Sequence, residues 1–304
     1  MSDTATPIDE VPQQDKIFLG SVYICISAIM FAAAGAAVKL ALQDISPIQL
    51  VFWRNLLSMI IFGGFLVIFR RSAFSDLRST KTSLHLLRSV LSLLVLYSYF
   101  YAVSKIELAT AVLLLSTSPI FVPIFALLFL GHVSARTVWL GVLIAFLGVT
   151  IVIDPTLQYS FDFSNYLGMG IGLFSGLLGG AATVIIWKMS RTETPDRQMV
   201  YFTVVSFLLS LPLCFYNWQT PKLATFFPIV ALGIATTLAQ YYLSKGCQVA
   251  PADKINTWNY LSIVIAGLAA YVGWNESLSL PTIAGMVLVV VGARVASKTL
   301  KSNA

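Results

Sequence analysis

Long runs of apolar residues, separated by short polar stretches, fill most of the chain. A bilayer core of about 30 Å needs roughly 20 helical residues to cross it. In lipid every backbone N–H and C=O group must be bonded within its own segment, so such runs are predicted to be helices. The pattern predicts ten of them, over residues 17–42, 47–69, 84–104, 109–130, 135–153, 166–188, 198–217, 223–245, 253–273 and 280–298.

The composition also indicates an all-α membrane protein. Of the 304 residues 58% are hydrophobic and only 11% are charged, and the mean hydropathy is +0.84. A soluble domain carries roughly 25% charged residues, so this chain has too few charges to cover a surface that faces water. The segment 1–16 is polar and acidic, unlike the basic start of a secretory signal. It is therefore predicted to be a retained tail, like residues 299–304.

Lysine and arginine are distributed unevenly between the two predicted sides of the membrane. Inner loops of membrane proteins are enriched in these residues, so both termini are predicted to be cytoplasmic, in a bacterial inner membrane. The net charge of +6 is then explained by inner loops that face anionic lipid, and it does not indicate binding to nucleic acid. Fifteen basic residues fall at the inner ends of the helices, namely Lys16, Arg70, Arg71, Arg78, Lys81, Arg88, Arg136, Lys188, Arg191, Arg197, Lys245, Lys254, Arg294, Lys298 and Lys301, against four at the outer ends, Lys39, Arg54, Lys105 and Lys222.

The second half of the chain repeats the first at a slowly drifting offset. An odd number of helices per copy makes the second copy enter the membrane upside down, so two inverted five-helix repeats are predicted, residues 17–153 and 166–298. Secondary transporters use such repeats to open a central site to each face in turn. The matched pairs are Gly20–Gly168, Ser27–Ser175, Ala34–Ala182, Pro47–Pro195 and Ser58–Ser206 at offset 148, Tyr101–Tyr242, Ala109–Ala250 and Ala111–Ala252 at 141, and Gly141–Gly285 and Gly148–Gly292 at 144.

Several stretches resemble the EamA family of the drug/metabolite transporter (DMT) superfamily. They are "FWRNLL", "HLLRSVLSLLVLYSYFYAVSKIELATAVLLLSTSPIFVPIFALLFLG" and "YYLSKGCQVAPADKINTWNYLSIVIAGLAAYVGWNESLSLPTIAGMVLVVVG". Within the last of these, "NYLSIVIAGLAAYVGWNE" is similar to bacterial S-adenosylmethionine uptake permeases of that branch. The resemblance covers nearly the whole chain. It implies ten helices as five plus five and the transport of a small organic metabolite.

Two positions depart from the pattern of that family. The family usually has Gly-Glu after the fourth helix, where this chain has Gly131-His132, whereas Glu276 keeps the acid in the second repeat. Many relatives have proline at the position of Tyr260, which lies opposite Pro119 at the offset of 141. The first departure weakens a transport role for a pair of acids, so these groups are expected to be polar helix ends.

Arg54 interrupts the apolar stretch "VFWRNLL" about seven residues from the outer end of its helix. At 1.5 Å per residue this is a depth of roughly 10 Å. A charge there is costly unless it faces the bundle interior or water. Three explanations are open: the side chain snorkels to the headgroups, it clamps backbone carbonyls, or it contacts substrate together with Trp53.

Polar and aromatic residues also gather at matching places of the two repeats. In "LLSTSPIFVP", Pro119 and Pro123 remove backbone donors, and broken helices of this kind line the sites of transporters. Alternatively, the hydroxyl groups beside the break satisfy the freed carbonyls, and the aromatic residues serve packing or an interfacial belt. The predicted substrate-binding residues beyond Trp53 and Arg54 are Tyr97, Tyr101, Ser116, Ser118, Gln240, Asn256, Trp258, Asn259 and Tyr260.

These features predict a secondary transporter with a small-molecule substrate, contact with membrane lipid and no nucleic acid, as a monomer or homodimer. Aromatic and amide groups suit a planar or cationic solute, such as one like S-adenosylmethionine. No phosphate loop, nucleophile motif or metal-ligand spacing is present, so no enzyme activity, cofactor or metal is predicted. The alternatives are an amino-acid or drug exporter, a lipid-modifying membrane enzyme, and a sensor or scaffold.

Overall fold

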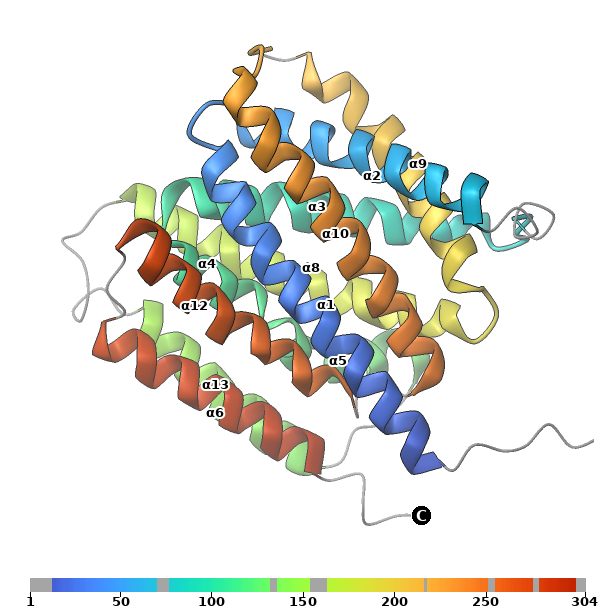
Figure 1. Cartoon of the computed structure of the whole chain (residues 1–304). Helices are drawn as coiled ribbons and strands as arrows, with labels where there is room; N and C mark the ends of the chain where they lie inside the picture. The colour runs from blue at the N-terminus through green and yellow to red at the C-terminus, as the bar shows by residue number, and fades with distance from the viewer. Residues whose placement is uncertain are drawn as a thin grey trace, which may run out of the picture.

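A computed structural model describes residues 13–69, 77–131, 136–153, 163–215, 218–250, 255–275 and 279–298. Helices make up nearly all of these residues, and no strand occurs among them (Figure 1). The helices are α1 (Gln13–Ala41), α2 (Pro47–Phe69), α3 (Thr82–Lys105), α4 (Leu108–Leu115), α5 (Ser118–Leu130), α6 (Arg136–Ile153), α8 (Phe163–Ser190), α9 (Pro195–Cys214), α10 (Leu223–Val249), η2 (Asn256–Tyr260), α12 (Leu261–Trp274) and α13 (Leu280–Lys298).

The helices confirm the all-α prediction, and each predicted apolar segment falls on one helix or on two consecutive helices. Seven of them are long and apolar enough to cross a bilayer, α4 and α5 counting as one. Three shorter apolar helices lie in α6, in η2 together with α12, and in α13. Large apolar side chains such as Leu223, Phe227 and Val272 point outward. Such a surface is unfavourable in water and is suited to lipid.

Helices that are distant in the sequence pack together in pairs. Helix α1 lies along α10, α3 along α8 and α2 along α9, while α6 and α13 form a separate pair at the lower edge of Figure 1. That separate pair depends on small residues. A Cβ atom at Gly148 would lie 2.7 Å from the carbonyl oxygen of Gly285, and one at Gly292 would meet the carbonyl oxygen of Gly141 at 2.5 Å. Glycine therefore lets the two backbones approach.

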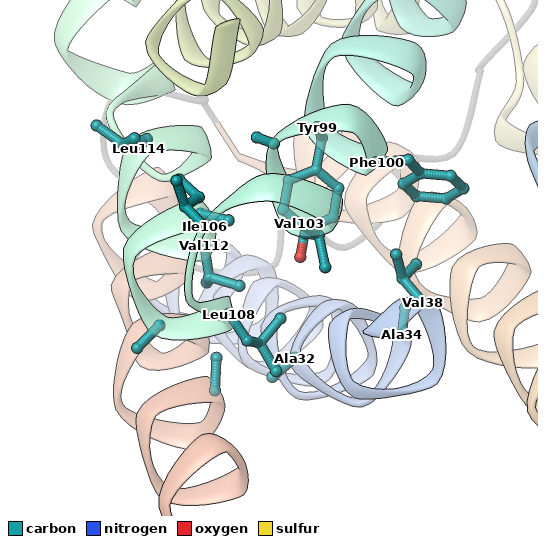
Figure 2. Packing of buried hydrophobic residues seen from close by; sticks show 14 of the residues in the cluster. Ala32, Ala34, Val38, Tyr99, Phe100, Val103, Ile106, Leu108, Val112 and Leu114 are labelled. Atoms are coloured by element: carbon teal, nitrogen blue, oxygen red, sulfur yellow. The ribbon is translucent and has the colours of Figure 1, made fainter. Parts of the chain in front are cut away.

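The largest buried cluster of apolar side chains among the described residues draws mainly on α1, α3, α4 and α12, with further members from α2 and α10. Figure 2 shows how Tyr99 and Phe100 of α3 and Val112 of α4 face Ala34 and Val38 of α1. Small residues on α1 allow the bulkier side chains of α3 and α4 to pack close to its backbone. The cluster holds the helices in the arrangement that surrounds the cavity described below.

Candidate functional site

A cavity of about 140 Å³ lies inside the bundle, at the middle of α3 and α10. Its volume is sufficient for several water molecules or for part of an organic solute. Side chains of α1, α2, α3, α4, α5, α8, α9, α10, η2 and α12 form its walls. A largely apolar hollow with a few polar groups has the character of a small-molecule site.

Five of the predicted site residues line this cavity. They come from separate parts of the chain, one from α2, two from the junction of α4 and α5, one from α10 and one from η2. The sequence therefore located polar groups that folding brings together. These residues are Arg54, Ser116, Ser118, Gln240 and Asn259.

Arg54 is held inside the bundle with only 1% of its surface exposed. Its Nε donates a hydrogen bond to Thr236 Oγ1 at 3.1 Å, and its Nη1 donates to Asn55 Oδ1 at 2.8 Å. The guanidinium also lies 5.3 Å from the centre of the Phe202 ring, which is within the range of a cation–π contact. These contacts exclude snorkelling, and the partners are side-chain oxygens and not backbone carbonyls.

Arg88 is a second buried arginine, which the sequence pattern grouped with the basic helix ends. The side chain is fully buried, which its position near a helix end did not predict. Its Nη1 donates to Gln198 Oε1 at 2.9 Å and its Nη2 to Ser244 Oγ at 3.3 Å. Its guanidinium lies 5.2 Å from the centre of the Phe202 ring, the ring that Arg54 also contacts. Like Arg54, it interrupts an apolar run, and this signal could have identified it.

The predicted break in the fourth apolar segment is real, and it separates α4 from α5. The hydroxyl of Thr117 donates to the carbonyl of Leu114 at 2.6 Å, and the backbone N–H of Thr117 donates to the same carbonyl at 3.2 Å. Ser116 on the same break lies 3.4 Å, oxygen to oxygen, from Ser262 of α12. One hydroxyl at the break thus bonds the backbone, while Ser116 and Ser118 line the cavity. Their role in binding a substrate stays a prediction.

Glycine residues of α8 allow that break to approach closely. A Cβ atom at Gly180 would lie 2.7 Å from Phe121 Cβ and 2.8 Å from the carbonyl oxygen of Ser118. Gly179, on the same helix, lines the cavity. The glycine-rich stretch of α8 thus works as a packing face, because the backbone of α5 occupies the space that a side chain would need.

The other predicted aromatic residues do not line this cavity. Trp53 belongs to an aromatic group in which its ring centre lies 6.0 Å from that of Trp218 and 5.6 Å from that of Phe226. Tyr260 is only 4% exposed and packs in the large apolar cluster. Trp258 is 51% exposed. Their role in binding therefore stays a prediction.

Two tyrosines of α3 also face elsewhere. Tyr97 packs against the large apolar cluster, and its buried hydroxyl has no hydrogen-bond partner among the described residues. Tyr101 lies under the ammonium group of Lys105, 5.8 Å from nitrogen to ring centre. The side chain of Asn256 lies outside the described part of the structure, as do His132 and Glu276.

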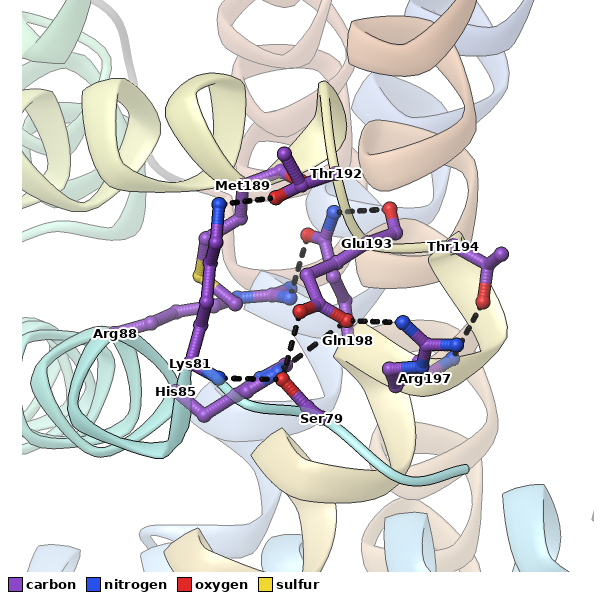
Figure 3. Close-up of polar contacts among 10 residues, drawn as sticks. All are labelled: Ser79, Lys81, His85, Arg88, Met189, Thr192, Glu193, Thr194, Arg197 and Gln198. Atoms are coloured by element: carbon purple, nitrogen blue, oxygen red, sulfur yellow. Dashed lines mark hydrogen bonds and ion pairs between the residues drawn. The ribbon is translucent and has the colours of Figure 1, made fainter. Parts of the chain in front are cut away.

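A polar cluster closes one end of the bundle, where the start of α3 meets the turn between α8 and α9 (Figure 3). Glu193 is buried there and accepts hydrogen bonds from Ser79 at 2.7 Å and from Arg197 at 2.8 Å. Its Oε2 lies 3.8 Å from Nε2 of His85, whose ring stacks on Tyr201. We call this group the Glu193 cluster. Sequence reading missed it because its members lie in separate loops and helix ends.

Hydrogen bonds determine the charge of Glu193. Burial alone would raise its pKa, but the hydrogen bonds from Ser79 and Arg197 and the positive charge of Arg197 together lower the pKa below its ordinary value. Glu193 is therefore ionised at neutral pH. Arg197 donates to the carboxylate of Glu193, and its own backbone N–H donates to the hydroxyl of Thr194. These bonds keep the carboxylate next to α3, so the second half of the chain is connected to the first at this end.

A second polar group occupies the opposite end, where the loop after α1 meets the start of α10. Asp44 Oδ2 accepts from the backbone N–H of Lys222 at 2.9 Å and from the hydroxyl of Thr225 at 2.8 Å. Its Oδ1 lies 2.8 Å from Lys222 Nζ. Gln49 and Gln219 add two further hydrogen bonds at this end. We call it the Asp44 cluster.

The described residues contain no group of three or more histidine, cysteine or acidic side chains that could hold a metal ion. Cys25, Cys214 and Cys247 are separate thiols.

Comparison with known proteins identifies relatives of this chain. The sequence pattern of the EamA-like transporter family matches residues 18–154 and again residues 166–298. The pseudopaline exporter of Pseudomonas aeruginosa is 28% identical over 94% of this chain and 99% of its own length. The S-adenosylmethionine uptake transporter of Rickettsia bellii is 23% identical over 90% of this chain and 91% of its own.

More distant similarities agree with these. The riboflavin transporter of Vibrio cholerae is 25% identical over 66% of each chain. A solved crystal structure shares the fold, with a TM-score of 0.67 and 18% identity over 95% of this chain and 99% of that one. The relatives are transporters of small molecules, in agreement with the character of the cavity.

Proposed function

The chain belongs to the EamA-like transporter family, and from this premise we propose that it carries a small organic metabolite by alternating access between two inverted five-helix repeats. The central cavity is the observation that carries the proposal, because both halves of the chain supply its walls. Arg54 and Ser116 come from the first half, and Gln240 and Asn259 from the second. A site between two such halves can be exposed to each face in turn.

The packing of the helices supports the inverted repeat, with residues 17–153 and 166–298 as its two copies. By the sequence repeat, α1 corresponds to α8 and α3 to α10. Helix α1 packs on α10, and α8 packs on α3, which is the same contact with the copies exchanged. The contacts of α2 with α9 and of α6 with α13 each join a helix to its own counterpart. A two-fold axis between the copies produces this pattern.

Ten crossings with both termini in the cytoplasm complete the proposal. The seven long apolar helices and the three shorter ones, in α6, in η2 together with α12, and in α13, supply the crossings. The excess of basic residues on the inner side supports the orientation, and a bacterial inner membrane is the location that fits it. The energy for transport comes from a solute gradient or a coupled ion, since the sequence contains no nucleotide-binding loop.

Two substrate assignments follow from the relatives. The first is a planar solute like S-adenosylmethionine, as the name of the Rickettsia relatives suggests. The second is export of an amino-acid-like or drug-like compound. The higher identity and coverage of the Pseudomonas relative, whose name is that of an exporter, favour this second assignment.

Uptake into proteoliposomes tests the proposal. Purified protein would be reconstituted and offered a panel of labelled metabolites, both with a solute gradient alone and with an added proton gradient. We expect saturable uptake of at least one solute and faster uptake when the vesicles are preloaded with the same solute, because alternating access permits exchange. Uptake no faster than in protein-free liposomes across the whole panel would contradict a transport function.

A further inference from the structure

Arg54 has one nitrogen, Nη2, that forms no hydrogen bond with the described residues beside the cavity. Its Nε and Nη1 donate to Thr236 and Asn55, whereas Nη2 has no acceptor among the described residues. The arginine lines the cavity and its guanidinium remains charged at any physiological pH. A buried charged donor without an acceptor is costly, so this position is suited to an acceptor that arrives with the solute.

The positive charge of this region is not balanced by protein carboxylates. Arg88 contacts the same ring of Phe202, and its hydrogen-bond partners, Gln198 and Ser244, are neutral. None of the acidic residues in the sequence falls in the middle of a predicted membrane segment. Two guanidinium groups in a medium of low dielectric therefore attract an anion strongly.

We propose that the cavity selects solutes that carry an anionic oxygen group, a carboxylate in the first instance, and that Arg54 is the residue that binds this group. This inference rests on the proposed transport function and names the substrate class. Arg54 Nη2 donates to the anion, while Thr236 and Asn55 fix the plane of the guanidinium. Arg88 adds positive potential but does not bind the solute, because it is not among the residues that line the cavity.

The rest of the cavity fits the remainder of such a solute. Gln240 lies one helical turn beyond Thr236 on α10, so both residues share a face. Its Oε1 is buried and has no hydrogen-bond donor among the described residues, which makes it an acceptor for an N–H or O–H group of the solute. Apolar walls from Phe31, Phe100 and Leu115 match an organic body. The cavity therefore favours a carboxylate-bearing organic solute over a purely cationic one.

A purely structural role for Arg54 would have a different consequence. The side chain links α2 to α10 through Thr236, so its removal weakens the bundle in any case. A structural role, however, cannot distinguish an acid from its neutral amide as a ligand. The decisive quantity is therefore the ratio of the affinities for matched acid and amide, which does not depend on the overall stability of a variant.

Binding to the detergent-solubilised protein measures this ratio. The probes are phenylacetate with phenylacetamide, L-phenylalanine with its amide, and phenyl phosphate, each followed by the shift in unfolding temperature over a concentration series. We expect the carboxylates to raise the unfolding temperature at concentrations about 10-fold to 100-fold lower than their amides, as a charge-assisted hydrogen bond to a buried group implies. Phenyl phosphate distinguishes carboxylate selection from selection of any oxyanion.

Variants assign the selectivity to one residue. Arg54→Gln should abolish the preference for acid over amide, and Arg54→Lys, which keeps the charge, should retain part of it. Lys188→Gln removes one positive charge from an exposed position and should keep the full preference. Equal responses to acid and amide in the wild-type protein, including no response to either, overturn the inference, as does an unchanged preference in Arg54→Gln.

The uptake panel separates this inference from the proposed function. Transport of solutes without any anionic oxygen group, by a protein that prefers no acid over its amide, would leave transport in place and reject Arg54 as the selecting residue. A preference for acids in the binding experiment, with no uptake of any labelled solute, would support the anion site and reject transport.

Discussion

Each end of the helix bundle has a lysine whose ammonium group contacts a side-chain oxygen, but the chemical nature of that oxygen differs between the two ends. Lys222 Nζ forms an ion pair with Asp44 at one end, at 2.8 Å, whereas Lys81 Nζ donates to the hydroxyl of Thr192 at the other, at 3.1 Å. The offsets of the sequence repeat, 141 and 148, pair Lys81 with Lys222 and Asp44 with Thr192. A single contact thus occurs twice, once with a carboxylate and once with a neutral acceptor.

At the end where Lys81 bonds Thr192, the carboxylate belongs to the residue that follows Thr192, namely Glu193. Glu193 is buried and accepts from two side chains, whereas 79% of the Lys222 side chain in the other pair is exposed. An exposed ion pair contributes little because water and salt screen it, whereas a hydrogen bond to a buried charge contributes about 1.5–3 kcal/mol. If both ends open during transport, the end with the Glu193 cluster should be the harder one to open.

The largest effect is expected for Glu193→Gln, because the change keeps the shape of the side chain and removes its charge. The loss of charge-assisted hydrogen bonds should weaken closure of that end by about 2 kcal/mol, or about 30-fold in the opening equilibrium. The measurement uses Ser118→Cys, inside the cavity, in a protein whose three native cysteines are replaced. An impermeant maleimide applied to the Glu193 face should label this cysteine correspondingly faster.

The opposite end supplies the control for this experiment. Asp44→Asn removes a carboxylate at the other end and should leave labelling from the Glu193 face unchanged. An unchanged labelling rate in Glu193→Gln would mean that the cluster does not keep this end closed, and the difference between the ends would then have to be sought elsewhere.

The sequence predicted the helices and some residues of the candidate site, but not the residues that contact Arg54. Arg54 could be found because a charge inside an apolar run has few explanations, and the break at Ser116 could be found because two prolines follow it. Thr236 and Phe202, which hold Arg54 in place, are ordinary residues in helices far along the chain. Only tertiary packing shows that they meet it.

The burial of Arg88 was not predicted, for a related reason. Counting residues from a helix end gives depth along the helix axis but says nothing about which way a side chain points. The same limit applies to Tyr97 and Tyr260, whose polar aromatic character marked them for the site. The structure packs both against the large apolar cluster, because helical spacing defines a face without defining the neighbour that covers it.

An intermediate effect is expected for Asp44→Asn, measured from the other face. The backbone N–H of Lys222, then its side chain and the hydroxyl of Thr225, lower the pKa of Asp44 from 3.8 to about 2. A lowered pKa means that the carboxylate stabilises this end above about pH 4 and loses the effect as the pH falls toward 2. At pH 7 the variant should therefore label a few-fold faster than the wild type.

Acidification gives the same comparison without a mutation. The labelling rate of each protein falls with pH because the maleimide reacts with the thiolate, so the two proteins are compared at each pH. The ratio of the wild-type rate to that of Asp44→Asn should rise toward one as the pH is lowered from about 4 to 2. A ratio that is constant over this interval, or equal to one at pH 7, would show that the ion pair does not hold this end.

The smallest effect is expected for Thr192→Asp, which gives the Lys81 end the acid that its counterpart has. Thr192 is exposed, so the new ion pair with Lys81 should slow labelling from this face by only about 1.5-fold to 3-fold. The nearby charge of Glu193 reduces the gain further. Thr192→Asn, of the same shape without the charge, is the matched control. Because salt screens exposed pairs, the difference between the two variants should disappear at 1 M salt. A difference that persists there would mean that the substitution acts through the buried cluster and not through the exposed pair.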